Sequence, residues 1–80
     1  MQIYVGNLSH DVTDAELLRA FGAFGQVATA KVMRNVKGRS RGFAFVEMPS
    51  REEAHTAVQG LNGNQMKGRL VSVNEARPRT

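Results

Sequence analysis

Two helix start signals divide this chain into two similar halves. Thr13 is followed three residues later by Glu16, and Ser50 is followed at the same spacing by Glu53, so each pair has the pattern of a capping box. Apolar residues at helical spacing follow each box, first Leu17, Leu18 and Phe21 and then Ala54, Ala57, Val58 and Leu61. Each predicted helix comes after a segment with strand-like alternation. The chain therefore contains a strand-helix unit twice.

Four segments have the alternating, β-rich pattern of strands: residues 2–5, 26–33, 42–48 and 70–74. Gly6 and Asn7 end the first of them, Gly38 offers a turn between the second and third, and residues 62–63 form a turn after the second helix. The element order is βαββαβ. This order predicts an α+β, ferredoxin-like sandwich with two helices on one face of a four-stranded antiparallel sheet.

The length and composition exclude several classes of protein. Eighty residues suffice for one domain, which we expect at residues 1–76, with a flexible basic tail at residues 77–80. The chain contains no cysteine, so disulfides, thiolate metal sites and a cysteine nucleophile are excluded. No clustered metal ligands are present, and we expect no metal and no cofactor. No apolar run approaches the roughly 20 residues of a membrane span, so we expect a soluble intracellular protein.

The charge favours an acidic partner such as nucleic acid. Eleven lysines and arginines against seven acidic residues give a formal net charge of +4. No acidic residue lies between Leu17 and Val46, whereas six basic residues do: Arg19, Lys31, Arg34, Lys37, Arg39 and Arg41. Such a run is also compatible with an ordinary solvated surface, so it needs support from other residues.

The third strand segment supplies that support. Alternation places one set of side chains on each side of the strand: Phe43, Phe45 and Glu47 against Ala44, Val46 and Met48. The aliphatic set suits a layer packed under helices, which leaves both phenylalanines on the open face together with Tyr4 of the first strand. The opposite orientation, with the phenylalanines in the core, remains an alternative. Exposed aromatic rings beside mobile cations are what single-stranded nucleic acid requires, because every base has a face that stacks on a ring.

Two motifs resemble those of a known family. Residues 41–48, Arg-Gly-Phe-Ala-Phe-Val-Glu-Met, resemble the octapeptide K/R-G-F/Y-G/A-F-V-x-F/Y of the RNA-recognition motif (RRM) family, with a departure at Met48. By alternation Met48 faces the helices, so the departure affects packing rather than stacking. Residues 3–8, Ile-Tyr-Val-Gly-Asn-Leu, resemble the family's hexapeptide on the first strand, and residues 21–25 are similar to its first-helix exit. The resemblance is greatest to small single-domain bacterial RRM proteins.

The resemblance implies a set of RNA-binding residues. Tyr4 and Phe43 would stack on bases, and Phe45 would pack against sugars or between neighbouring nucleotides. Arg41 would pair with a phosphate. Lys31 and Met33, on the open face of the second strand, would border the RNA, and Arg39 belongs to the basic loop beside it.

Further positions near the strand ends and in the tail complete the expected site. Asn7 would hydrogen-bond a base edge or serve only as a turn residue at the end of the strand. Asn74 and the backbone near Ala76 resemble positions where the family reads bases. Arg77, with Arg79, would add phosphate contacts or extend into solvent. Lys67 and Arg69 flank Gly68 in a turn and are interpreted as structural.

Two functions of other classes compete with RNA binding. Some domains of this fold bind proteins through their helices, and this remains the alternative hypothesis. Small phosphate-ester or acyl-phosphate hydrolases share the βαββαβ order, but they need an arginine in a glycine-rich loop after the first strand. Residues 6–12 contain neither arginine nor lysine, and we expect no catalysis.

The expected biological setting follows from the resemblance. The partner would be single-stranded RNA, with weaker binding to single-stranded DNA, and the protein would be a monomer without a membrane. Its role would be post-transcriptional regulation or RNA chaperoning. It would act in the cytoplasm if the source is bacterial, and in the nucleus or cytoplasm otherwise.

Overall fold

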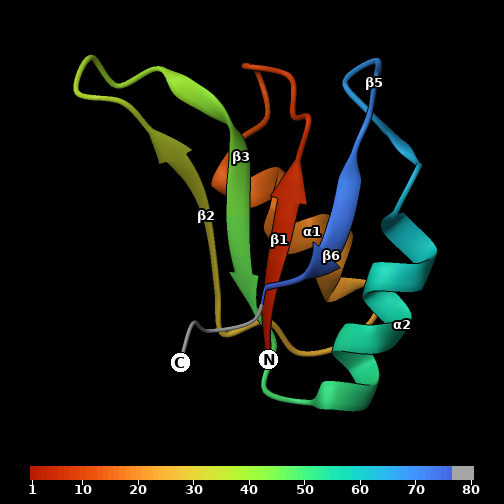
Figure 1. Ribbon diagram of the computed structural model, residues 1–80. Coiled ribbons are helices and arrows are strands. Elements are labelled where there is room, and N and C mark those ends of the chain that lie inside the picture. The colour runs from red at the N-terminus through yellow and green to blue at the C-terminus, as the bar shows by residue number, and fades with distance from the viewer. Residues whose placement is uncertain (77–80) are drawn as a thin grey trace.

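The structure, a computed structural model, describes residues 1–76 and has the predicted element order. The main elements are β1 (Gln2–Gly6), α1 (Asp14–Gly22), β2 (Thr29–Arg34), β3 (Ser40–Glu47), α2 (Arg51–Leu61) and β6 (Ser72–Glu75). The four strands form one antiparallel sheet in the order β2-β3-β1-β6, and in Figure 1 α1 lies behind this sheet. The ferredoxin-like α+β fold expected from the sequence is therefore confirmed.

Both helices begin at the predicted N-caps. The Thr13 hydroxyl accepts a hydrogen bond from the Glu16 amide, and the Ser50 hydroxyl accepts one from the Glu53 amide, each at 3.3 Å. These bonds satisfy backbone donors that have no partner inside the helix. The Glu53 carboxylate accepts a hydrogen bond from the Gln26 amide, in the segment before β2, at 3.0 Å.

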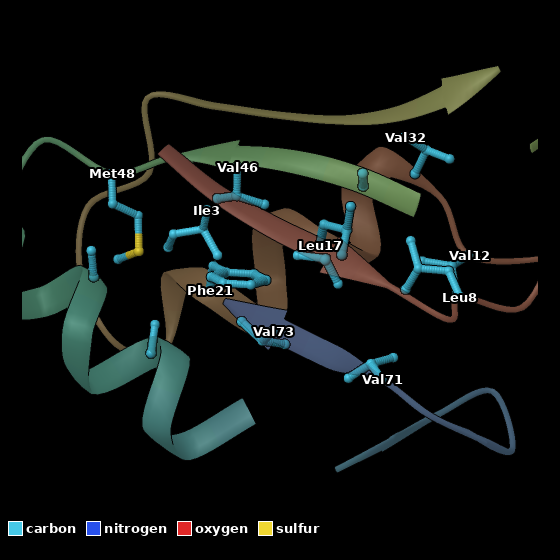
Figure 2. Packing of buried hydrophobic residues seen from close by; sticks show 14 residues of the cluster. Ile3, Leu8, Val12, Leu17, Phe21, Val32, Val46, Met48, Val71 and Val73 are labelled. Atoms are coloured by element: carbon cyan, nitrogen blue, oxygen red, sulfur yellow. The ribbon is translucent and has the colours of Figure 1, made fainter. Parts of the chain in front are cut away.

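The buried side chains form one layer between the sheet and the helices (Figure 2). The two central strands contribute Ile3, Val5, Ala44 and Val46, with Met48 just beyond, and the helices contribute Leu17, Phe21, Ala54 and Ala57. The aliphatic side of β3 thus faces the helices, as predicted. The alternative in which the phenylalanines of this strand form the core is excluded by their partial exposure.

The strand ends differ from the prediction. The second strand begins at Thr29 rather than at residue 26, because the Gln26 amide is bound to a carboxylate of α2 instead of a neighbouring strand. The third strand begins earlier than expected, at Ser40, and ends at Glu47. The last strand of the main sheet starts at Ser72, and Leu70 belongs to a separate hairpin.

This hairpin was predicted only as a turn. It pairs β4 (Gln65–Met66) with β5 (Arg69–Leu70) as a separate two-stranded sheet. The two residues between them, Lys67 and Gly68, have φ values of 53° and 84°, the positive values of the tight turn that joins short antiparallel strands. In Figure 1 the hairpin and the β2–β3 loop lie at the same end of the sheet.

Replacing Phe21 by alanine tests the single-layer core. The ring is fully buried, so Phe21→Ala should lower the free energy of unfolding by about 3–5 kcal/mol. A domain of this length has roughly 4–12 kcal/mol in total, so much of its stability should be lost. Urea unfolding followed by circular dichroism measures the effect, with the fully exposed Val36→Ala as the control. Equal midpoints for the two variants would contradict the described core.

Candidate nucleic-acid interface

A row of four side chains crosses the open face of the sheet. Strand pairing puts Lys31 opposite Phe45, Phe45 opposite Tyr4, and Tyr4 opposite Asn74. Each of these residues is at least partly exposed, while the residues that alternate with them are mostly buried. One line across all four strands therefore presents a cation, two aromatic rings and an amide to solvent.

Phe43 joins the two rings of this row to make an aromatic cluster. The centroids of Tyr4, Phe43 and Phe45 are 5.9–6.0 Å apart in every pair. The Tyr4 and Phe43 rings are within 29° of parallel, whereas Phe45 is edge-on to both, at 64° and 86°. Aromatic pairs favour offset and edge-to-face arrangements of this kind, so the cluster is held together by contacts among its own members.

A bulge at the start of β3 places Arg41 next to this cluster. Val32 pairs with Ala44 and Arg34 pairs with Ser40, so β3 has more residues than β2 between these two pairs. Gly42, inside the bulge, has φ of 83°, a value that side chains rarely permit. The Arg41 guanidinium carbon lies 5.4 Å from the centroid of the Phe43 ring, within cation–π distance.

The basic loop between β2 and β3 is an ordered turn built around Asn35. The Asn35 side-chain oxygen accepts hydrogen bonds from the amides of Lys37 and Arg39 at 2.9 and 3.1 Å. Gly38 has φ of 79°, which confirms the turn predicted at this residue. Lys37 and Arg39 are exposed on this turn, and the half-buried Met33 precedes it on β2. The cations of the loop are therefore carried on a defined backbone.

The charge on this face is mainly positive near the rings. Lys31, in the row itself, and Arg41, at the bulge, are both exposed. Glu47 lies further along β3, opposite Thr29 and Gln2, and its carboxylate is 3.3 Å from the N-terminal ammonium group of Met1. The Glu47 carboxylate is thus paired with the N-terminal ammonium group. It lies two residues along β3 from Phe45, away from the row that contains Tyr4 and Lys31.

Asn7 has the turn role that was one of its two predicted roles. Its φ is 58°, in the left-handed region, where asparagine is among the few tolerated side chains. Its amide nitrogen donates to the Leu70 carbonyl at 2.6 Å, and its oxygen accepts from the Arg69 guanidinium at 2.7 Å. The Asn7 side chain therefore connects the β4–β5 hairpin to the end of β1 through two hydrogen bonds.

This connection was not predictable from the sequence, because the partners are more than sixty residues apart and no local signal links them. The structural role predicted for Lys67 and Arg69 agrees with their contacts, since the Lys67 ammonium lies 3.4 Å from the Glu16 carboxylate and Arg69 donates to Asn7. Asn74 is exposed, and its amide donates to the Ser72 hydroxyl at 3.2 Å. Arg77, Arg79 and the expected tail lie outside the described residues.

Three other kinds of feature are absent from the described residues. Among residues 1–76 no group of three or more histidine or acidic side chains could hold a metal ion. No enclosed pocket is present in this part of the chain. None of the described helices is long and apolar enough to cross a bilayer.

Comparison with known proteins gives the family. The sequence profile described as "RNA recognition motif" matches residues 3–72, which include both motifs and the aromatic cluster. The chain belongs to the RNA recognition motif family. Curated proteins similar to this chain include "Putative RNA-binding protein RbpE" of Nostoc, 45% identical over 99% of this chain and 81% of the relative. The "28 kDa ribonucleoprotein, chloroplastic" of Spinacia oleracea is 48% identical over 98% of this chain but only 34% of the relative.

Solved structures of the family superimpose closely on this chain. The crystal structure titled "RNA Binding Protein PG1" has a TM-score of 0.94 and 40% identity, and the match covers 100% of this chain and 98% of that one. The structure titled "SXL-LETHAL PROTEIN/RNA COMPLEX" has a TM-score of 0.93 at 35% identity, over 99% of this chain and 48% of that one. "Structure of Rna15 RRM with bound RNA (GU)" has a TM-score of 0.86 at 31% identity, over 96% and 83% of the two chains.

Replacing Asn7 tests whether its hydrogen bonds to the β4–β5 hairpin stabilise the domain. Asn7→Ala removes two hydrogen bonds and puts alanine in the left-handed region, so it should lower the free energy of unfolding by about 2–3 kcal/mol. Asn7→Gly should lose about 1 kcal/mol less, because glycine accepts this backbone without strain. Chemical denaturation measures both. Two variants as stable as the original chain would show that the hairpin does not depend on Asn7.

Proposed function

We propose that this protein binds single-stranded RNA on the open face of its sheet, without catalysis. The observation that carries the proposal is the aromatic cluster of Tyr4, Phe43 and Phe45, partly exposed and bordered by Lys31 and Arg41. Rings of this kind stack on bases, and the neighbouring cations neutralise phosphates. Family membership, relatives named as RNA-binding proteins and neighbours solved with RNA support the same function.

The stacking roles of the three rings can be divided by their surroundings. The guanidinium of Arg41 covers one face of Phe43, whereas Phe45 lies between Lys31 and Tyr4 at the centre of the row. These positions support a different division from the one expected from sequence. Tyr4 and Phe45 stack on neighbouring bases, and Phe43 packs against sugars with Arg41 beside it at a phosphate.

The remaining residues border the strand of RNA. Lys31 and Met33 line the β2 side of the rings, and Arg39 reaches phosphates from the Asn35-centred turn. Asn74, opposite Tyr4 on β6, offers its amide and carbonyl groups to a base edge. The proposal also includes a base contact by Asn7 and a phosphate contact by Arg77.

The proposed stacking and phosphate contacts also determine which nucleic acids the protein binds and how specifically. Stacking and phosphate pairing do not require a 2′-hydroxyl, so single-stranded DNA should bind more weakly but measurably. The row spans a few nucleotides, which suits a monomer of micromolar affinity and low sequence specificity. A role in post-transcriptional regulation or RNA chaperoning in the cytoplasm of a bacterial cell fits such a module.

Removing the rings should weaken RNA binding without unfolding the protein. Tyr4→Leu and Phe45→Leu should each weaken binding by roughly 5- to 150-fold, the effect of losing about 1–3 kcal/mol of base stacking. Phe43→Leu should have a smaller effect. Fluorescence anisotropy of a labelled random single-stranded RNA pool measures the affinity, and Leu18→Ala, on the exposed side of α1, is the control. Unchanged binding by the Phe43→Ala/Phe45→Ala double variant would rule out the sheet face.

Salt dependence tests the phosphate contacts. With roughly two to four phosphates neutralised, log K against log salt concentration should have a slope of about −1.5 to −3. Arg41→Ala should make this slope shallower by about 0.7, the value for one phosphate on a single strand. Arg19→Ala, an exposed arginine on α1, should leave the slope unaltered. An unaltered slope in the Arg41 variant would remove Arg41 from the phosphate contacts.

A further inference from the structure

Gly6 lies on the open face of β1, but it is buried. It follows Tyr4 by two residues, so both positions point to the same side of the sheet, and it pairs with Ser72 on β6. A residue on this side would normally be exposed, because the helices cover the other face. The cover comes from Tyr4, whose side chain leans along β1 over the glycine.

The space above Gly6 is filled by the far end of the Tyr4 side chain. A Cβ atom placed on Gly6 would lie 2.6 Å from the Tyr4 hydroxyl oxygen, 2.7 Å from Cε2 and 2.9 Å from Cζ. A Cβ atom essentially never lies this close to another heavy atom, so any other residue at position 6 requires the Tyr4 side chain to move. The restriction is one of space, because the φ of Gly6 is not in the left-handed region.

Displacement of Tyr4 would alter the aromatic cluster and leave the core intact. The atoms in conflict are at the end of a side chain that can rotate about its first two bonds, and Ile3 and Val5 on either side are buried on the opposite face. Rotation of the ring would change its near-parallel arrangement with Phe43, where the centroids are 6.0 Å apart. It would also change the surface that the ring offers beside Phe45.

We propose that Gly6 is a positioning residue for RNA recognition: the absence of a side chain at this position sets the orientation of the Tyr4 ring on which a base stacks. The effect on RNA rests on the proposed function, but the effect on the ring does not. Position 6 therefore controls RNA affinity through Tyr4. Gly6 itself is buried beneath the Tyr4 side chain and has no side chain that could contact the RNA.

The composition of the chain provides a direct probe of this ring. Tyr4 is the single tyrosine and tryptophan is absent, so the tyrosine fluorescence and the tyrosine band in near-ultraviolet circular dichroism report on Tyr4 alone. Both signals are measured in the free protein. They test the position of the ring whether or not RNA binds.

The experiment compares Gly6→Ala with Gly22→Ala, a helical position where an added Cβ meets nothing within 4 Å. Gly6→Ala should fold with a thermal midpoint near that of the original chain, change the tyrosine band and weaken RNA binding about fivefold or more. Gly22→Ala should leave the tyrosine band and RNA affinity unchanged. In a Tyr4→Leu background, Gly6→Ala should have no further effect on affinity, since the ring that it displaces is gone.

The outcomes separate the two proposals. Failure of the original chain to bind RNA would overturn the proposed function, while the tyrosine band would still test the role of Gly6. An unchanged band and affinity in Gly6→Ala, or an equal loss of affinity in the Tyr4→Leu background, would overturn the positioning role. If Gly6→Ala does not unfold cooperatively, the added Tyr4→Leu change should restore folding, and failure to restore it would also overturn the proposal.

Discussion

The open face depends on how the two central strands pack against the helices. β1 and β3 pair in a register that directs their aliphatic side chains, among them Ile3 and Val46, into one layer beneath α1 and α2. In a strand, burying one set of alternate residues commits the other set to the opposite side. The two helices cover a single face, so the rings of Tyr4, Phe43 and Phe45 have no helix to pack against. Their exposure is thus a consequence of the same packing that stabilises the domain.

The exposed rings are nevertheless confined. Their ring centroids are about 6 Å apart in each pair. The Arg41 guanidinium lies over the Phe43 ring, and the absence of a side chain at Gly6 leaves space for the end of the Tyr4 side chain. A binding surface whose side chains are already ordered loses less conformational entropy when a partner binds. The cations lie on ordered backbone as well, on the turn built around Asn35 and at the bulge of β3.

Local patterns predicted the elements and the faces, whereas contacts between distant residues were not predictable. Alternation is a property of one strand, so the outward position of Phe43 and Phe45 could be read from the sequence. The position of the Arg41 guanidinium over the Phe43 ring could not be predicted from the sequence, because it depends on a bulge between β2 and β3. The start of β2 was misplaced because the Gln26 amide binds a carboxylate of α2. The partners of Asn7 come from the other end of the chain, in a hairpin whose strands of two residues are too short to detect.

A nuclear magnetic resonance titration of the labelled protein with a short single-stranded RNA tests the central claim, that RNA lies on the open face. The account predicts that the backbone amide signals of the row shift most, namely those of Lys31, Phe45, Tyr4 and Asn74, with those near Arg41. Signals from the exposed sides of α1 and α2 should stay in place. Shifts concentrated on the helices, with the row unaffected, would contradict the account and favour recognition through the opposite side of the molecule.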